Sequence, residues 1–198
     1  MTNTEDFAAL VSSRICHDLI SPIGAIGNGV ELLEMTGQGN GPELALISDS
    51  AQSASARVKF FRIAFGSAKE GQAIGIDEIS AILSARGRDG RFRYTWTEDG
   101  TIDRTEAKLL FLAILCVEHA LPRGGQIQVD RTQRGWLVRS AGGKAHLDDV
   151  LWTALQQGKE PLSLDSGRIQ FAALAMMLGG SGRRLVVDQT DGQLTLTL

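Results

Sequence analysis

One short segment of the chain carries residue types that are suited to nucleophilic chemistry. The segment reads Arg14-Ile15-Cys16-His17-Asp18-Leu19-Ile20-Ser21-Pro22. A neutral imidazole leaves one ring nitrogen free to attack phosphorus, and an ordinary histidine is substantially neutral at about pH 7. Asp18 can hydrogen-bond the ring of His17 or select its tautomer, and Arg14, one helical turn earlier, can contact phosphoryl oxygens. For each of these two charged residues the alternative is a solvated surface charge.

The helix expected around this segment places His17 at its surface. His17 lies one residue, or about 100°, beyond the apolar position Cys16. Its neighbours on the same face are polar or small: Ser13, Arg14, Ser21 and Gly24. Pro22 cannot donate to the carbonyl of Asp18, which costs about 3 kcal/mol inside a helix. Because such local conflicts mark functional sites, we favour a reactive His17 over a merely solvated one.

Two long helices must position this segment. Apolar residues recur in each at alternating steps of three and four, which makes a seam with a period of about 3.5 residues. The first seam is Cys16, Leu19, Ile23, Ile26, Val30 and Leu33, and the second is Leu44, Ile47, Ala51, Ala54, Val58, Phe61 and Phe65. Gly37 and Pro42 favour a turn between the helices. We expect an antiparallel hairpin, and because two helices cannot enclose a core, a homodimer that forms a four-helix bundle.

A second domain follows, in which the periodicity is mixed. We expect residues 1–70 to form the hairpin, and 76–198 to form the second domain after a linker over 69–75. The expected elements are a helix ending at Gly87, a strand over 92–96, a helix over 103–121, a hairpin of 126–130 with 136–140, helices over 147–157 and 166–178, and a hairpin of 184–188 with 194–198. This order predicts an α/β sandwich with one five-stranded sheet, and an α+β fold for the chain.

Composition narrows the class of protein. The 20 Lys and Arg against 23 Asp and Glu give a net charge of −3, which provides no general attraction for nucleic acid or a membrane surface. The longest apolar run, Leu109 to Val117, is too short to cross a bilayer, and the acidic start lacks the basic region of a signal peptide. We therefore expect a cytoplasmic protein. Cys16 and Cys116 lie in apolar helical stretches, so we expect two reduced core residues and no metal site.

The first helix resembles the phosphoacceptor helix of histidine kinases. The matching residues are His17-Asp18-Leu19-Ile20-Ser21-Pro22, Gly24-Ala25-Ile26 and Asn28-Gly29-Val30-Glu31-Leu32-Leu33. Over the entire chain the sequence most closely resembles the ChpT-type histidine phosphotransferases, and Ala120-Leu121-Pro122-Arg123-Gly124-Gly125 also occurs in related sequences. The resemblance implies that His17 is the phosphoacceptor, that Asp18 orients it, and that the second domain is similar to a kinase ATP-binding domain.

The second domain departs from an active kinase in the motifs that hold nucleotide. The resemblance leads us to expect a magnesium-binding asparagine on the helix over 103–121, but that helix contains none. The acidic glycine motif D-x-G-x-G is replaced by Arg139-Ser140-Ala141-Gly142-Gly143-Lys144, and no glycine-rich lid occurs between Leu147 and Gly167. A nucleotide site does not easily survive those losses. We expect a degenerate domain that neither uses nor hydrolyses ATP.

The resemblance implies a phosphotransferase of a bacterial multi-step phosphorelay, with a phosphohistidine intermediate. His17 would take a phosphoryl group from the receiver-domain aspartate of a hybrid histidine kinase and pass it to the receiver of a response regulator. The receiver brings its own Mg²⁺, so we expect no cofactor in this chain. Arg14, Ser21 and Asn28 are the residues expected to contact the phosphoryl group or the partner.

Two other functions stay open. One is an ATP-dependent autokinase with an atypical nucleotide site. The other is a dimeric scaffold or inhibitor that binds a kinase or receiver and transfers nothing. Labelling by ATP without a donor protein would favour the first, and full activity after His17→Ala would favour the second.

Overall fold

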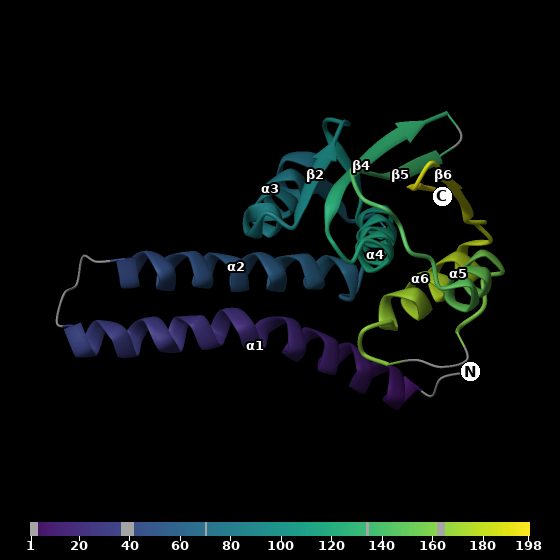
Figure 1. Cartoon of the computed structure of the whole chain (residues 1–198). Coiled ribbons are helices and arrows are strands. Elements are labelled where there is room, and N and C mark those ends of the chain that lie inside the picture. Colours follow the sequence, from purple (N-terminus) through teal and green to yellow (C-terminus); the bar gives the residue numbers. More distant parts are fainter. Residues whose placement is uncertain (1–3, 37–41, 70, 134, 162–164) are drawn as a thin grey trace.

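The computed structural model describes residues 4–36, 42–69, 71–133, 135–161 and 165–198, and the structural statements below concern these residues. Helix α1 (Thr4–Thr36) and helix α2 (Pro42–Ala64) run side by side and antiparallel, and the sheet-containing half lies at the end of the hairpin where α2 ends (Figure 1). The predicted hairpin is confirmed. Of the predicted turn over 37–42, residues 37–41 lie outside the described residues.

Two residues of α1 explain its shape and its closeness to α2. Pro22 lies within the helix, where it removes the N–H that would bond the carbonyl of Asp18, and α1 is visibly bent in Figure 1. At Gly29 a Cβ atom would lie 2.5 Å from Cγ1 of Ile47, so a side chain there would push the two helices apart. The absence of a side chain at this position lets α1 and α2 pack closely.

The second half is built on one five-stranded sheet, as predicted. Its strand order is β2-β4-β5-β7-β6, with β2 parallel to β4 and every other pair antiparallel. The strands are β2 (Phe92–Trp96), β4 (Gly125–Thr132), β5 (Gly135–Ala141), β6 (Val186–Thr190) and β7 (Gln193–Thr197). A small second sheet pairs β1 (Ala73–Gly75) with β3 (Thr101–Asp103). Our prediction placed β1 in a linker, because three residues are too few for a periodic pattern.

Four helices complete this half. They are α3 (Ile76–Arg86), which runs into a 3₁₀ turn (Gly87–Asp89), α4 (Arg104–Ala120), α5 (Asp149–Gln156) and α6 (Ile169–Ser181). The side chain of Asp103 caps α4 by accepting a hydrogen bond from the backbone N–H of Thr105 at 2.7 Å. Helix α4 contacts the sheet, α2 and α6, and it is buried on nearly all sides (Figure 1). The predicted α+β class is confirmed.

The hydrophobic core extends from the sheet-containing half into the end of α2. Phe60 and Phe61 of α2 are 0% and 2% exposed, and the ring centroid of Phe60 lies 4.6 Å from that of Phe111 in α4. Phe7 and Ile15 of α1 pack on the edge of the same core. The hairpin is therefore anchored at this end, and its outer part projects away.

A buried polar network ties three elements together beneath α2. Glu118 of α4 accepts hydrogen bonds from Nε and Nη2 of Arg86 at 3.0 and 2.7 Å, and from the hydroxyl of Tyr94 at 2.7 Å. The guanidinium of Arg86 also lies 4.3 Å from the ring centroid of Phe60. Burial and the neighbouring Glu118 raise the pKa of Tyr94 well above its ordinary value, so its hydroxyl remains a donor.

The two cysteines differ in their environments. Cys116 is fully buried in α4, as predicted, and burial raises the pKa of its thiol. Cys16 is exposed, so its prediction as a core residue is wrong for the single chain. The reason is that only half of the first seam faces α2, whereas Cys16 belongs to the half that faces away.

Candidate functional site

His17 stands out from the surface of α1. Its side chain is 81% exposed, which confirms the predicted projection into solvent. Nδ1 lies 3.2 Å from Oδ1 of Asp18. Because an ionised carboxylate only accepts hydrogen bonds, this contact favours the tautomer with the proton on Nδ1. Nε2 is then the nitrogen with a free lone pair.

Asp18 and Arg14 lie beside His17 and are far less exposed. The side chain of Asp18 is 12% exposed, and its Oδ2 lies 3.3 Å from Nε of Arg14. Arg14, whose side chain is 20% exposed, also donates from Nη1 to the carbonyl of Gly167 at 3.2 Å. The structure thus brings together three of the predicted site residues and adds Gly167. The contact between Arg14 and Gly167 could not be predicted from the sequence, because 153 positions separate the two residues.

The segment around Gly167 is held by its neighbours. Gln170, which is 1% exposed, donates from Nε2 to the same Gly167 carbonyl at 2.9 Å. Arg168 lies 3.6 Å from a carboxylate oxygen of Asp165 and 3.9 Å from one of Asp148. These contacts fix the acceptor that Arg14 uses.

His119 is the second histidine close to this cluster. Its ring lies edge-on to Phe171, with 5.4 Å between centroids. Burial, followed by the positive charges of Arg168 and Arg14, lowers the pKa of His119. His119 itself is exposed on α4, and the lowered pKa favours its neutral form beside these positively charged neighbours.

The other two predicted site residues lie further along α1. Ser21 is exposed and lines a hollow of about 290 Å³ between α1, α2 and the end of α3. The same hollow is lined by two basic and two acidic residues, Arg57, Arg88, Asp49 and Asp89, and Nη2 of Arg57 lies 3.8 Å from Oδ2 of Asp89. Asn28 is exposed on α1 but lines none of the hollows described here.

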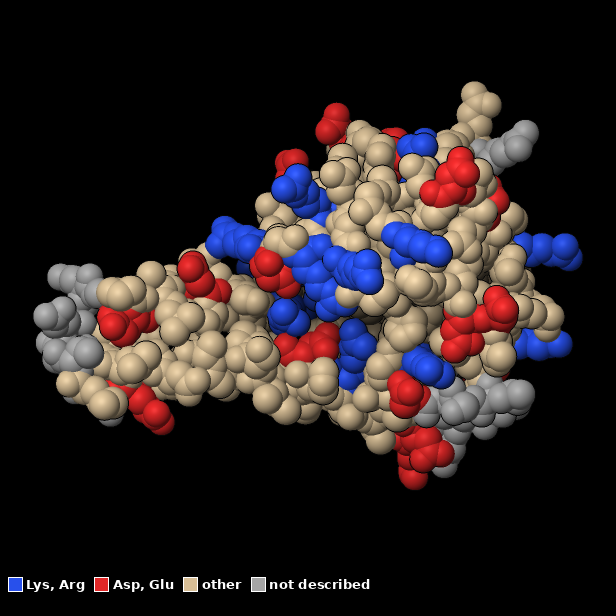
Figure 2. All heavy atoms as spheres, viewed as in Figure 1, with Lys and Arg blue, Asp and Glu red and all other residues tan. Residues whose placement is uncertain are grey.

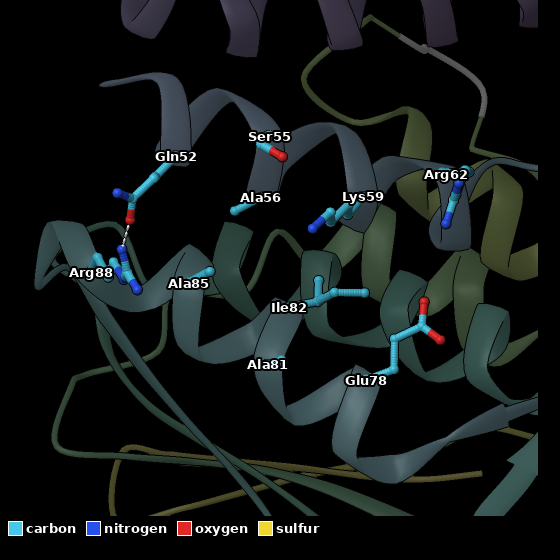
Figure 3. A pocket seen from close by; sticks show the side chains of 10 residues that line it. All are labelled: Gln52, Ser55, Ala56, Lys59, Arg62, Glu78, Ala81, Ile82, Ala85 and Arg88. Atoms are coloured by element: carbon cyan, nitrogen blue, oxygen red, sulfur yellow. Dashed lines mark hydrogen bonds between the residues drawn. The ribbon is translucent and has the colours of Figure 1, made fainter. Parts of the chain in front are cut away.

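A neighbouring hollow of about 270 Å³ lies between α2 and α3 and is rich in positive charge. Figure 3 shows Lys59 pointing into the space between the helices, with Arg88 reaching toward Gln52 at one end and Arg62 opposite Glu78 at the other. Its floor and roof are small apolar residues such as Ala56 and Ala85. Lys and Arg side chains gather over this part of the molecule in Figure 2, so the local charge is positive although the chain is net negative.

Within the described ranges we find neither a cluster of metal ligands nor a helix that could span a membrane. Nowhere there do three or more His, Cys, Asp or Glu side chains come together in a way that could hold a metal ion. Among the helices of the same ranges, none combines the length and hydrophobicity that a membrane span requires.

An exposed histidine on a helical hairpin, followed by a five-stranded sandwich, is the arrangement expected of a histidine phosphotransferase. Comparison with known proteins supports this class. Residues 76–193 match the family described as "Histidine phosphotransferase C-terminal domain". The solved structure of a bacterial phosphotransferase is similar over 99% of this chain and 97% of that one, with 30% identity and a TM-score of 0.78. The chain therefore belongs to the histidine phosphotransferase family.

Two other known proteins are similar to this chain. The protein phosphotransferase ChpT of Brucella abortus (strain 2308) is 42% identical over 126 residues, which are 63% of this chain and 60% of that protein. This chain thus spans less than two thirds of its curated relative. The histidine kinase AdeS of Acinetobacter baumannii is more distant, with 12% identity over 91% of this chain and 95% of that chain, and a TM-score of 0.44.

Proposed function

We propose that this protein is a histidine phosphotransferase that carries a phosphoryl group between the aspartates of two receiver domains, with Nε2 of His17 as the carrier atom. The observation that carries the proposal is the exposure of His17, 81%, combined with the 3.2 Å contact that occupies its Nδ1. A nucleophile that serves another protein must be reachable from outside, and its reactive nitrogen must be unoccupied. Nε2 meets both requirements.

The transfer step needs no base on this chain. As the bond between phosphorus and Nε2 forms, the bond between phosphorus and the donor's aspartate oxygen breaks. The electron pair leaves with that oxygen and restores the donor carboxylate. Nδ1 keeps its proton, so the ring becomes positively charged beside the Asp18 carboxylate, which stabilises it. Transfer to the second receiver reverses these bond changes.

We further propose that the sandwich does not use ATP. In α4, the helix where the resemblance leads us to expect a magnesium-binding asparagine, every residue from Leu109 to Val117 is apolar and buried. Magnesium prefers oxygen ligands, and none of the side chains from Leu109 to Val117 carries an oxygen atom. The Mg²⁺ for each transfer then comes from the receiver domain.

The receiver is proposed to dock over His17 and the hollows beside it. A receiver presents an acidic pocket around its aspartate. Arg57 and Arg88 offer complementary charge in the hollow that contains Ser21, and Lys59 offers it in the neighbouring hollow. Arg57 lies 3.8 Å from Asp89 in a partly exposed pair, which a partner carboxylate can replace at little cost. Asn28 would extend this surface along α1.

We also propose that two chains pair through the hairpin. The exposed members of the two seams repeat every seven residues: Cys16, Ile23 and Val30 on α1, and Leu44, Ala51 and Val58 on α2. Ile23 and Val58 are 57% and 49% exposed. A seven-residue apolar repeat on both helices of a hairpin is what a four-helix bundle buries, so the second hairpin belongs to another copy of this chain.

Transfer from a labelled receiver tests the proposed function. A receiver domain that carries ³²P on its aspartate is mixed with the wild type, with His17→Ala, and with His119→Ala as a matched control. We expect acid-labile, base-stable label on the wild type and on His119→Ala, and none on His17→Ala. Label that persists on His17→Ala would refute the proposal. A parallel arm with labelled ATP and Mg²⁺ alone separates the autokinase, which would label itself there.

A further inference from the structure

Arg14 connects the helix of His17 to the sandwich through a single guanidinium group. Its Nε lies 3.3 Å from Oδ2 of Asp18, which is an ion pair without a hydrogen bond, and its Nη1 donates to the Gly167 carbonyl at 3.2 Å. A guanidinium is planar and rigid, so the hydrogen bond at Nη1 and the ion pair at Nε together favour one orientation. With 20% exposure, the side chain has little room to leave this position.

The acceptor on the sandwich side is itself immobilised. The Gly167 carbonyl also accepts from Nε2 of Gln170 at 2.9 Å, and Gln170 is 1% exposed in the first turn of α6. The next residue, Arg168, forms ion pairs with Asp165 and Asp148. Arg14 is therefore attached to a fixed point of the sandwich rather than to a free loop.

Arg14 affects the orientation of His17 through Asp18, which contacts both residues. The two carboxylate oxygens of Asp18 have separate partners, with Oδ2 facing Arg14 and Oδ1 facing Nδ1 of His17. The positive charge of the guanidinium attracts Oδ2 and so favours one rotation of the carboxylate about its last bond. Without Arg14, Asp18 would be free to turn its charge toward water, and the ring of His17 would lose its partner.

We propose that Arg14 is a positioning residue through which the sandwich domain orients the His17 imidazole for transfer. The inference rests on the proposed function and gives the sandwich a role that requires no nucleotide. It differs from the role that the sequence suggests for Arg14, which is direct contact with phosphoryl oxygens. The two roles are separable, because a positioning residue acts only while Asp18 is present.

The test combines Arg14→Met, Arg14→Lys, Asp18→Asn and the double variant Arg14→Met with Asp18→Asn. Arg91→Met is the matched control, since Arg91 also donates to a backbone carbonyl at 3.2 Å, that of Pro122, but has no contact with Asp18. Single-turnover transfer from a phosphorylated receiver is measured against receiver concentration. The tautomer of His17 is read from its ring ¹⁵N shifts at a pH where the ring is neutral.

We expect Arg14→Met to lower the maximal transfer rate roughly tenfold to hundredfold, the scale on which misplaced reacting groups slow catalysis, with little change in the half-saturating receiver concentration. The His17 tautomer should shift away from the Nδ1–H form. Arg14→Lys, which keeps the charge but cannot span both contacts, should fall between Arg14→Met and the wild type and carries the test if Arg14→Met does not fold. The double variant should be no slower than Asp18→Asn alone.

Three results would overturn the inference: a rate for both Arg14 variants within about twofold of wild type, an unchanged tautomer, or losses that add in the double variant. The last of these would assign Arg14 to the phosphoryl group instead. Failure of the wild type to accept any phosphoryl group would refute the proposed function, and is thereby distinct from failure of this inference.

Discussion

Replacing Glu118 by Gln should destabilise the protein strongly while leaving its shape almost unchanged. Glu118 is the acceptor for three hydrogen bonds, two from Arg86 and one from Tyr94. The side chains of Arg86 and Glu118 are only 10% and 9% exposed. A glutamine has the same size, but it removes the negative charge and turns one acceptor oxygen into a donor. The Arg86 guanidinium is then buried without a counter-charge.

The magnitude follows from the burial of this pair. Removing one partner of a buried ion pair costs about 3–5 kcal/mol, because the other charge is left uncompensated. For a chain of this size each kcal/mol lowers Tm by about 2–4 °C, so Glu118→Gln should lower Tm by roughly 6–20 °C. The matched control is Asp89→Asn, since Asp89 is 47% exposed and lies 3.8 Å from Arg57. That partly exposed pair contributes at most about 1 kcal/mol.

Thermal and urea unfolding, followed by circular dichroism, measure both variants against the wild type. A triple variant, Arg86→Met with Tyr94→Phe and Glu118→Leu, removes all three polar partners and should recover most of the loss, because no buried polar group is then left unpaired. If the Tm of Glu118→Gln is within about 2 °C of the wild-type Tm, or is no lower than that of Asp89→Asn, the network does not stabilise the protein by about 3–5 kcal/mol.

Two further predictions concern pH and assembly. Burial, and then the charge of Glu118, raise the pKa of Tyr94 above its ordinary 10.0, so above that pH the unfolded chain loses a proton that the folded chain keeps. Stability should fall as the pH rises past 10.0, and Tyr94→Phe should reduce that dependence in urea titrations, whereas an unchanged slope would contradict the burial of this hydroxyl. Wild type should sediment at twice its chain mass of 21.3 kDa. Ile23→Glu should weaken the dimer by roughly a thousandfold, because it buries two charges, while Asn28→Glu, which is exposed on the side of α1 away from the seam, should not. A monomeric wild type, or equal effects of the two variants, would argue against the bundle.

Much of the fold is predictable because periodicity is a local property. The seven-residue repeats gave both hairpin helices, and alternation at Phe92, Tyr94 and Trp96 gave a strand that the structure confirms. Strands β1 and β3 were missed because each has three residues, and their pairing depends on neighbours rather than on pattern. The exposure of His17 was predictable from the polar residues one turn away.

The contacts that complete the site were not predictable in the same way. Arg14 and Asp18 are one turn apart, so their ion pair follows from helix geometry. The hydrogen bond from Arg14 to Gly167 depends on how α1 lies against the sandwich. Every residue has a backbone carbonyl, so the residue type does not reveal which carbonyl accepts the bond. Cys16 shows the converse limit, because an apolar seam position does not reveal whether the same chain or a second copy covers it.

The most direct measurement is to locate the phosphoryl group on the protein after transfer from a phosphorylated receiver. Mass spectrometry identifies the residue, and coupling between ³¹P and the ring protons identifies the nitrogen. We predict a single phosphohistidine at Nε2 of His17, since Asp18 occupies Nδ1. Phosphate on another residue, on Nδ1, or on no residue at all would contradict the account.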